Sequence, residues 1–130
     1  MNTIGIIGAM PSELVDIRKI LGDAEIVKKS GFDFYISNLN GKKIINACCG
    51  IAKVNSALCT QVLIDNFAPD CIINTGIAGG MNSDVKVCDI VISTDVLAHD
   101  LDPHFLAHYP PYCAVFKADE MLIEKAEKVC

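Results

Sequence analysis

Glu13 is the side chain whose type and position most directly suggest chemistry. It follows an apolar run at residues 4–7 and the small residues Gly8 and Ala9, and it lies in the first turn of a predicted helix. A buried strand that turns directly into a helix places the turn at the strand's carboxyl end, where open α/β sheets bind ligands. A carboxylate there could act as a general base. The alternative is that Glu13 only complements the helix dipole, as first-turn acidic residues commonly do.

A second glycine-rich turn, at residues 74–80, follows the apolar residues 71–73. Such a loop lets a ligand lie against bare backbone and offers N–H groups to a base or a ribose. The turn is no Walker loop, because no Gly-Lys-Ser/Thr follows, and Gly5 with Gly8 does not make the dinucleotide fingerprint. An ordinary tight turn stays open as the alternative.

The segment at residues 98–112 is rich in polar ligand types and in proline, and we expect a long loop there. Its possible metal ligands are His99, Asp100, Asp102 and His104. Their spacing matches no closed metal site, so a solvated or interface loop is the favoured interpretation. The same segment has an apolar patch that suits contact with another subunit, formed by Phe105, Leu106, Tyr109, Pro110 and Pro111.

The seven cysteines are odd in number and contain no C-x-x-C pair. Several lie inside strand or helix patterns, where cysteine behaves as a small hydrophobic residue. We therefore expect a reduced, cytoplasmic protein without a structural zinc site. Cys48 and Cys49 are poor candidates for a nucleophile, since no histidine is near them in sequence to activate a thiol.

The elements that would position these residues follow from hydrophobic spacing and turn signals. Met10, Leu14, Ile17 and Leu21 recur at helical spacing, and Pro11 suits a first helical turn. The chain then predicts strands at 24–29, 32–39 and 42–48, a helix from 50 to about 67, strands at 71–73 and 87–96, and a helix at 118–130. Because three consecutive strands are linked by hairpin signals, we expect a mixed sheet.

Composition limits the class of protein. A chain of 130 residues predicts a single domain over residues 1–130. It is 52% hydrophobic with a mean hydropathy of +0.38, which suggests an interface or a missing piece of the same fold. The net charge of −5 and a single arginine argue against a nucleic-acid partner. No apolar run approaches a membrane span, and the start lacks a basic signal-peptide region, so we expect no membrane partner.

Several motifs resemble, in order and spacing, those of the 5'-methylthioadenosine/S-adenosylhomocysteine nucleosidases of the nucleoside phosphorylase superfamily. They are IGIIGAM (4–10) with Glu13, GIAKV (50–54), IINTGIAGG (72–80), VCDIVIS (87–93), HDLD (99–102) and FKAD (116–119). The resemblance implies an α/β three-layer sandwich with a central mixed β-sheet flanked by helices. It covers only the amino-terminal part of the family's domain, so we expect a fold that is incomplete at its carboxyl end.

The resemblance also implies an activity, which is hydrolysis of the N-glycosidic bond to release adenine and a thioribose in methionine salvage. Glu13 matches the family's water-activating glutamate. The positions that match substrate-binding residues are Ala9, Met10 and Ile51 around the sugar and thioalkyl group, and Ile77, Ala78 and Gly79 beside the substrate. Ile77 stands where family members often have serine. No cofactor and no metal is implied.

In this family the loop after the His-Asp motif reaches into the neighbouring subunit's pocket, which implies a homodimer with Phe105 and Pro111 as the reaching residues. The family's general-acid aspartate and its ribose-binding methionine-glutamate pair come from the later half, so we expect little activity from residues 1–130 alone. The alternatives are a non-catalytic nucleoside-binding or dimerisation module, a futalosine-type nucleosidase, and a phosphorylase. Phosphate capture usually needs arginines, and Arg18 has no second guanidinium beside it, which favours hydrolysis.

Overall fold

A mixed five-stranded sheet forms the first part of the chain in the computed structural model, which describes residues 1–130. β2 (Glu25–Lys29), β3 (Phe32–Leu39) and β4 (Lys42–Cys48) pair antiparallel in sequence order. β1 (Thr3–Gly8) lies between β4 and β5 (Cys71–Asn74) and is parallel to both. The sheet order is therefore β2-β3-β4-β1-β5, and the predicted mixed sheet is confirmed.

The two hairpins begin and end where the turn signals predict. Ser30, Gly31, Asn40 and Gly41 all have positive φ, between 47° and 86°. Positive φ at both central residues belongs to the tight turns whose twist matches that of paired strands, and asparagine and glycine adopt it most readily. These local turns fix the bounds of β3 and β4.

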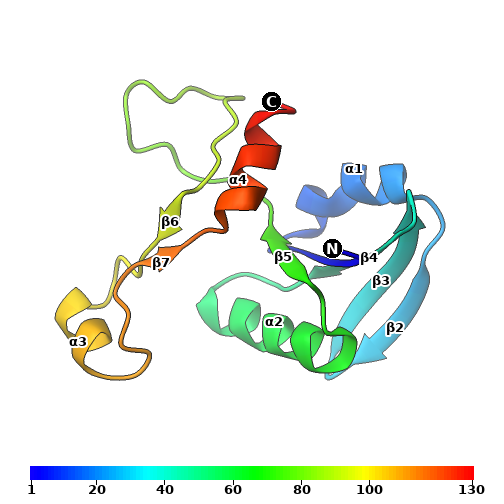
Figure 1. Cartoon of the computed structure of the whole chain (residues 1–130), viewed down its shortest axis with the longest axis horizontal. Helices are drawn as coiled ribbons and strands as arrows, with labels where there is room; N and C mark the ends of the chain where they lie inside the picture. Colours follow the sequence, from blue (N-terminus) through cyan, green and yellow to red (C-terminus); the bar gives the residue numbers. More distant parts are fainter. The chain divides into compact units, whose positions relative to one another are not determined.

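Two helices cover opposite faces of this sheet (Figure 1). Side chains alternate between the faces of a strand, so Gly5 and Gly8, three positions apart on β1, face opposite sides. A Cβ built on Gly5 would meet Leu63 of α2 (Lys53–Phe67), and one built on Gly8 would meet Leu14 of α1 (Pro11–Leu21). The predicted arrangement of helix, sheet and helix is confirmed.

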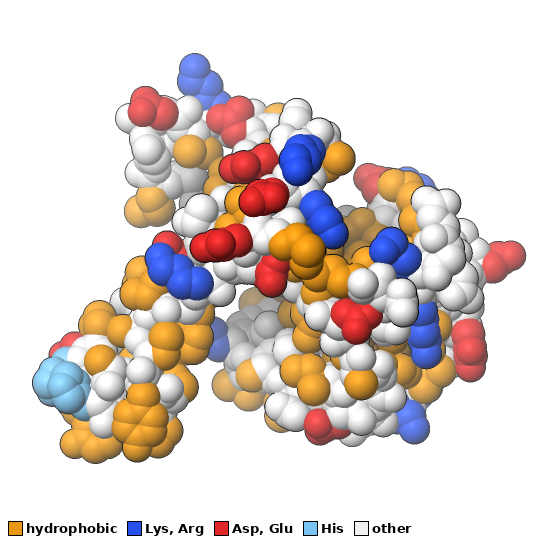
Figure 2. Space-filling view, viewed as in Figure 1, with side chains coloured by type: hydrophobic (Ala, Val, Ile, Leu, Met, Phe, Trp, Pro, Cys, Tyr) orange, Lys and Arg blue, Asp and Glu red, His pale blue; other side chains and the backbone are white.

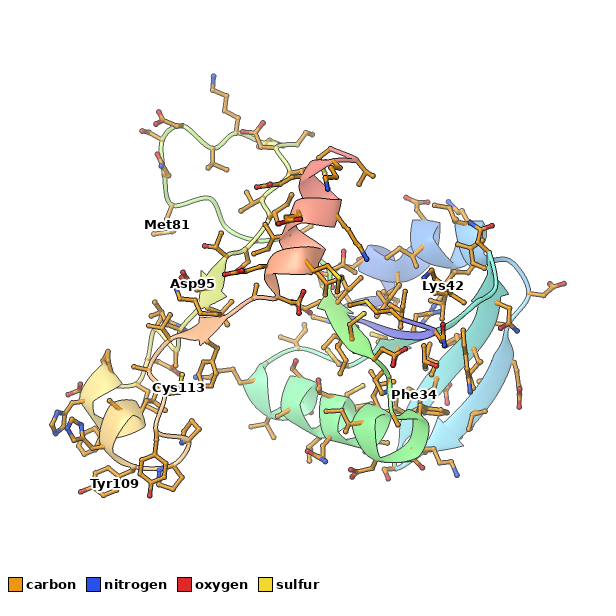
Figure 3. All side chains as sticks on the ribbon, viewed as in Figure 1. Phe34, Lys42, Met81, Asp95, Tyr109 and Cys113 are labelled. Carbon is orange, nitrogen blue, oxygen red and sulfur yellow. The ribbon has the colours of Figure 1, made fainter.

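The apolar core lies between the sheet and α2. Phe34 and Ile45 from the sheet and Cys59 and Leu63 from α2 are completely buried. Phe34 points toward α2 and its ring centroid lies 5.1 Å from that of Phe67 (Figure 3). This contact holds the carboxyl end of α2 against the antiparallel half of the sheet.

The face that α1 covers is more polar. Asn46 is only 1% exposed, and both ends of its amide are bonded. Its Oδ1 accepts from Arg18 Nε at 2.8 Å, and its Nδ2 donates to the Tyr35 carbonyl at 3.3 Å. Because the buried amide is satisfied, it carries little desolvation penalty there.

Residues 80–130 form a second compact unit. β6 (Asp95–Val96) and β7 (Phe116–Lys117) pair antiparallel, and Lys117 Nζ lies 2.9 Å from Asp95 Oδ2. The unit also contains α3 (Pro103–His108) and α4 (Glu120–Glu127). The helix predicted at 118–130 is thus present over its central residues.

Two predictions for this second unit are wrong. Of the strand predicted at 87–96, only Asp95–Val96 is a strand, and Ile90 and Val91 are 74% and 70% exposed. A strand exists only where its backbone finds a ladder partner, and residues 87–94 pair with none. The loop predicted at 98–112 contains α3, because Asp102 caps the helix by accepting from His104 N and Pro103 occupies its first turn.

None of the helices combines the length and the apolar character needed to cross a membrane.

Candidate active site

The carboxyl ends of three parallel strands lie at one edge of the sheet. β1 is hydrogen-bonded in parallel to β4 on one side and to β5 on the other. The bonds continue past the strand ends, since Cys49 N donates to the Gly8 carbonyl and Thr75 N to the Ile7 carbonyl, both at 2.9 Å. The turns after the three strands therefore lie side by side, at the edge where α/β sheets bind ligands.

Glu13 joins two of these turns. Its Oε2 accepts a hydrogen bond from Met10 N at 2.8 Å, and its Oε1 accepts one from Ile77 N at 3.0 Å. The first bond caps the start of α1, as a glutamate at the third helical position commonly does. The second bond joins residues 64 positions apart and fixes the carboxylate over the glycine-rich turn. Glu13 therefore has a structural role, and its carboxylate lies at the sheet edge where the turns after β1 and β5 meet.

Gly76 lets the glycine-rich turn approach this carboxylate. A Cβ built on Gly76 would lie 2.5 Å from Glu13 Oε1 and 2.8 Å from its Cδ. A side chain at position 76 would displace the Glu13 carboxylate, so glycine there permits the present contact between Ile77 N and Glu13. Gly76 is absent from the site residues predicted above, although the Asn-Thr-Gly-Ile order after a strand is a sequence signal for it.

The bonds to Glu13 stabilise its charged form. Hydrogen bonds from Ile77 N and Met10 N lower the pKa of the carboxyl from its ordinary value of 4.5, partial desolvation opposes them, and Ala9 N adds a smaller lowering. A carboxylate that accepts several backbone N–H bonds stays ionised at neutral pH. It can then orient a water molecule and accept its proton as bond making proceeds.

The structure brings some of the predicted site residues together. Met10 and Ile77 contact Glu13 through hydrogen bonds, and the Ala9 carbonyl accepts a 3.5 Å hydrogen bond from Cys48 Sγ at the end of β4. Ile51 follows in the turn after β4, with its side chain 68% exposed. Ala78 and Gly79 continue the chain from Ile77 and are exposed. This edge of the first unit is an open surface.

Phe105 and Pro111 belong to the second unit. Phe105 lies on α3 and is 54% exposed, and its ring centroid is 6.2 Å from that of Tyr109. Pro111 follows α3 and is exposed. The contribution of these two residues to a substrate pocket stays a prediction.

The possible metal ligands of residues 98–112 do not converge on a closed metal site. No three His, Cys, Asp or Glu side chains are grouped so that they could hold a metal ion. Asp102 instead caps α3 through its Oδ1.

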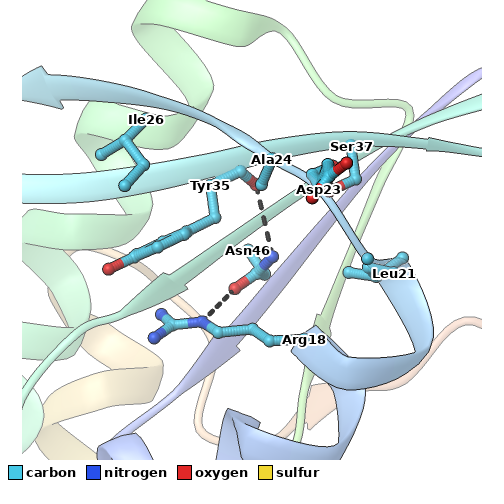
Figure 4. Close-up of a pocket in the computed structure, with 9 residues that line it drawn as sticks. Arg18, Leu21, Asp23, Ala24, Ile26, Tyr35, Ser37 and Asn46 are labelled. Atoms are coloured by element: carbon cyan, nitrogen blue, oxygen red, sulfur yellow. Dashed lines mark hydrogen bonds between the residues drawn. The ribbon is translucent and has the colours of Figure 1, made fainter.

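Two hollows of the first unit are lined by residues of α1 and of the sheet. One, of about 270 Å³, is lined by Arg18, Tyr35, Ser37 and Asn46 among others (Figure 4). The Arg18 guanidinium lies 3.8 Å from the centre of the Tyr35 ring, and both residues also line a second hollow of about 550 Å³. Neither hollow includes Glu13, so the candidate active site is separate from both.

Comparison with known proteins gives the site its context. Residues 3–130 match the family described as the Phosphorylase superfamily. The chain is 41% identical to a 5'-methylthioadenosine/S-adenosylhomocysteine nucleosidase of Oceanobacillus iheyensis, over 98% of this chain and 57% of that protein. It therefore spans little more than half the length of the curated relatives it matches.

Solved structures are similar over the same part. The nucleosidase of the same name from Neisseria meningitidis, in complex with methylthio-immucillin-A, has a TM-score of 0.90 and 39% identity, covering 98% of this chain and 57% of that one. Futalosine hydrolase of Helicobacter pylori also has a TM-score of 0.90, at 30% identity, and the covered shares are the same. Because the family match extends over nearly every residue, this chain belongs to the Phosphorylase superfamily.

Proposed function

We propose that this chain carries the water-activating part of a nucleosidase that hydrolyses the N-glycosidic bond of 5'-methylthioadenosine and S-adenosylhomocysteine. The observation that carries the proposal is the Glu13 carboxylate, fixed by Met10 N and Ile77 N where β1 and β5 end. The nucleosidases at about 40% identity support the choice of substrate.

In the proposed reaction Glu13 orients a water molecule toward the anomeric carbon of the ribose. The bond from that carbon to the adenine nitrogen breaks as positive charge develops on the sugar, and the water oxygen forms the new bond. Glu13 accepts the proton that this water loses. An ionised carboxylate close to the sugar also stabilises its positive charge, and this role suits a group whose pKa is lowered.

The neighbouring turns would bind the nucleoside. We assign Ala9, Met10 and Ile51 to the sugar and thioalkyl group, because the turns after β1 and β4 are adjacent. Ala78 and Gly79 would lie along the substrate with their backbone, beyond the Ile77 N–H that Glu13 occupies. The apolar Ile77 side chain would then supply contact area rather than a hydrogen bond.

Departure of adenine requires a proton, which we assign to an aspartate outside residues 1–130. General acid catalysis contributes typically about 10² to 10⁴ in rate. The ribose-binding groups that the resemblance places outside this chain would add positioning. The 130-residue chain alone is therefore expected to release adenine very slowly.

The test measures adenine release from 5'-methylthioadenosine by this chain alone and by this chain fused to the carboxyl-terminal part of the Oceanobacillus relative. We expect turnover from the fusion, and a loss of at least about 100-fold in the E13Q variant. Glu120, in the first turn of α4, provides the matched control, and E120Q should leave turnover unchanged. If the E13Q fusion hydrolyses 5'-methylthioadenosine as fast as the unmodified fusion, the assignment of Glu13 as the base is contradicted.

The likeness to futalosine hydrolase favours one second candidate substrate. The same fusion should be assayed with futalosine. Faster cleavage of futalosine than of 5'-methylthioadenosine would make futalosine the proposed substrate. Thermal protection by adenine without any turnover would instead indicate a nucleoside-binding module.

We further propose a homodimer in which Phe105 and Pro111 enter the partner's substrate pocket. The exposed apolar residues around α3 support this role, because contiguous apolar surface suits an interface. The active fusion should then sediment as a dimer.

A cytoplasmic location is also part of the proposal. None of the seven cysteines is joined in a disulfide, as expected in a reducing compartment. Burial raises the pKa of the Cys59 thiol to about 11, so this cysteine is an inert part of the core.

A further inference from the structure

Arg18 is the single arginine of the chain, and residues of two strands hold it in place. It lies on α1, and its Nε donates to Oδ1 of Asn46 on β4 at 2.8 Å. The centre of the guanidinium lies 3.8 Å from the centre of the Tyr35 ring on β3, which is the distance of a cation–π contact. Asn46 is itself buried and bonded to the Tyr35 carbonyl. The orientation of the guanidinium is therefore set before any ligand arrives.

These contacts leave one edge of the guanidinium unused. Figure 4 shows its far end pointing away from Asn46 and lying beside the Tyr35 ring. The ion pairs of the first unit join lysines to aspartates and do not include Arg18. Its terminal nitrogens, Nη1 and Nη2, thus have no carboxylate partner in the protein. An arginine commonly offers two parallel N–H groups to one carboxylate or phosphate group. Arg18 presents such a pair of donors in a fixed position.

The hollow of about 550 Å³ provides room for an anion beside these donors. Two cations, Arg18 and Lys28, line it together with one carboxylate, that of Asp33. Asp33 is paired with Lys28 at 3.4 Å, so the charge of Arg18 has no counter-charge among the lining residues. The hollow of about 270 Å³ differs, because Asp23 balances Arg18 in its wall. The larger hollow is therefore the one that favours an anion.

The wider surface gives no general attraction for anions. Figure 2 shows cationic and acidic side chains interspersed over the first unit, without one large basic patch. The net charge of the chain is −5, which disfavours the approach of anions from a distance. An anion bound beside Arg18 would have to be held by the groups of the hollow itself. A ligand with a single charge and an apolar part meets this requirement best.

We propose that Arg18 anchors a binding site for a small organic carboxylate that carries an apolar or aromatic group. The two carboxylate oxygens would accept from Nη1 and Nη2 in the bidentate geometry that arginine favours. The apolar group would lie against Pro11, Phe32 and Tyr35, which line the same hollow. A phosphate group has more charge and more acceptor oxygens than these donors can satisfy. The hollow does not include Glu13, so the proposal does not rest on the nucleosidase activity.

The test is an NMR titration of the ¹⁵N-labelled 130-residue chain with benzoate, and with benzamide as a neutral probe of the same shape. Because the chain has a single arginine, its Nε–H group gives a single signal of this type, which reports directly on the site. We expect benzoate to shift this signal together with the backbone signals of Gly31 and Phe32, which line the hollow. Benzamide should bind at least about tenfold more weakly, because it lacks the charge. Equal affinity for benzoate and benzamide would overturn the proposal.

Inorganic phosphate is the third probe. We expect it to bind more weakly than benzoate, because it gains no apolar contact in the hollow. Phosphate that binds more tightly than benzoate would overturn the assignment to carboxylates.

Two variants change the charge of the hollow and leave Arg18 and Asn46 in place. D33N removes the lining carboxylate and frees Lys28, so it should strengthen benzoate binding by about two- to fivefold. K28Q should weaken it by a similar factor. Lys29 is the matched control, because it lines neither hollow and neighbouring residues of a strand point to opposite faces. K29Q should bind benzoate as the wild type does. A D33N variant that binds no more tightly than K29Q would contradict the proposal.

R18Q removes the anchor itself. We expect at least about tenfold weaker benzoate binding, followed through the backbone signals of Gly31 and Phe32. The remaining backbone signals show whether R18Q is folded, and the gain expected in D33N cannot arise from a loss of folding. A folded R18Q variant with wild-type affinity for benzoate would overturn the proposal.

Discussion

Glu13 accepts hydrogen bonds that favour its ionised form, and this makes the stability of the first unit depend on pH. The bonds from Ile77 N and Met10 N hold the pKa of Glu13 in the folded chain below the ordinary 4.5. A carboxyl whose pKa is lowered on folding contributes stability above its unfolded pKa, and this contribution is lost as the pH falls through the folded pKa.

We therefore expect the E13Q variant to be less stable than the wild type at neutral pH. The difference should shrink as the pH falls from about 5 to below 4, because protonated Glu13 loses the advantage of its charge. Urea unfolding of both proteins across this pH range measures the difference in their free energies of unfolding. E120Q is the control, and a wild-type advantage over E13Q that grows on acidification would contradict the sign of the shift.

Gly76 allows a second test of the same contact. In G76A the new methyl group would overlap Glu13 Oε1, so we expect the bond from Ile77 N to break and the pKa of Glu13 to rise toward 4.5. Titration of the Glu13 carboxyl carbon by NMR measures this change. Gly79 is the matched control, because a Cβ there would meet no atom within 4 Å. An unchanged Glu13 pKa in G76A would show that the turn can move without losing the hydrogen bond from Ile77 N to Glu13.

At the scale of elements, α2 depends on a narrow contact with β1. Leu63 is completely buried, and its Cδ2 would lie 2.7 Å from a Cβ on Gly5. We expect L63A to lower the free energy of unfolding by about 2 to 5 kcal/mol, as buried Leu→Ala changes do. Leu58, on the same helix and 55% exposed, is the control, and L58A should cost less than about 1 kcal/mol. Urea unfolding measures the free energy of unfolding of both variants. Equal losses in L63A and L58A would contradict a core position for Leu63.

The elements that sequence reasoning located well are those determined by nearby residues. β3 and β4 follow from two hairpin turns, and α1 follows from its apolar spacing and Pro11. Most of the strand predicted at 87–96 is absent, because an apolar composition alone does not supply a ladder partner. The prolines around α3 favour a loop, whereas Asp102 and Pro103 are ordinary helix-start signals, and in the structure the start signals prevail.

At the scale of the whole molecule, the resemblance suggests candidate site residues, and the structure shows how some of them are joined. Nothing in local spacing predicts that Glu13 accepts from Ile77 N, because the two are distant in sequence and meet only through the pairing of β1 with β5. The close approach of Gly76 to the Glu13 carboxylate follows from that contact. The sequence could therefore indicate a carboxylate at the sheet edge, while its orientation depended on the assembled sheet.

The order of strands in the sheet has a consequence for how the chain folds. β1 is synthesised before the other four strands of the sheet, yet it pairs with two strands that come later, with Thr3 opposite Lys43 and Ile4 opposite Cys71. The β2-β3-β4 meander is built from local hairpins and can form early, whereas the parallel pairs require closure of long loops. Until β4 and β5 have left the ribosome, the apolar residues of β1 have no permanent partner. The strand that leads into the proposed catalytic residue is thus the one that a nascent chain must shield from aggregation for longest.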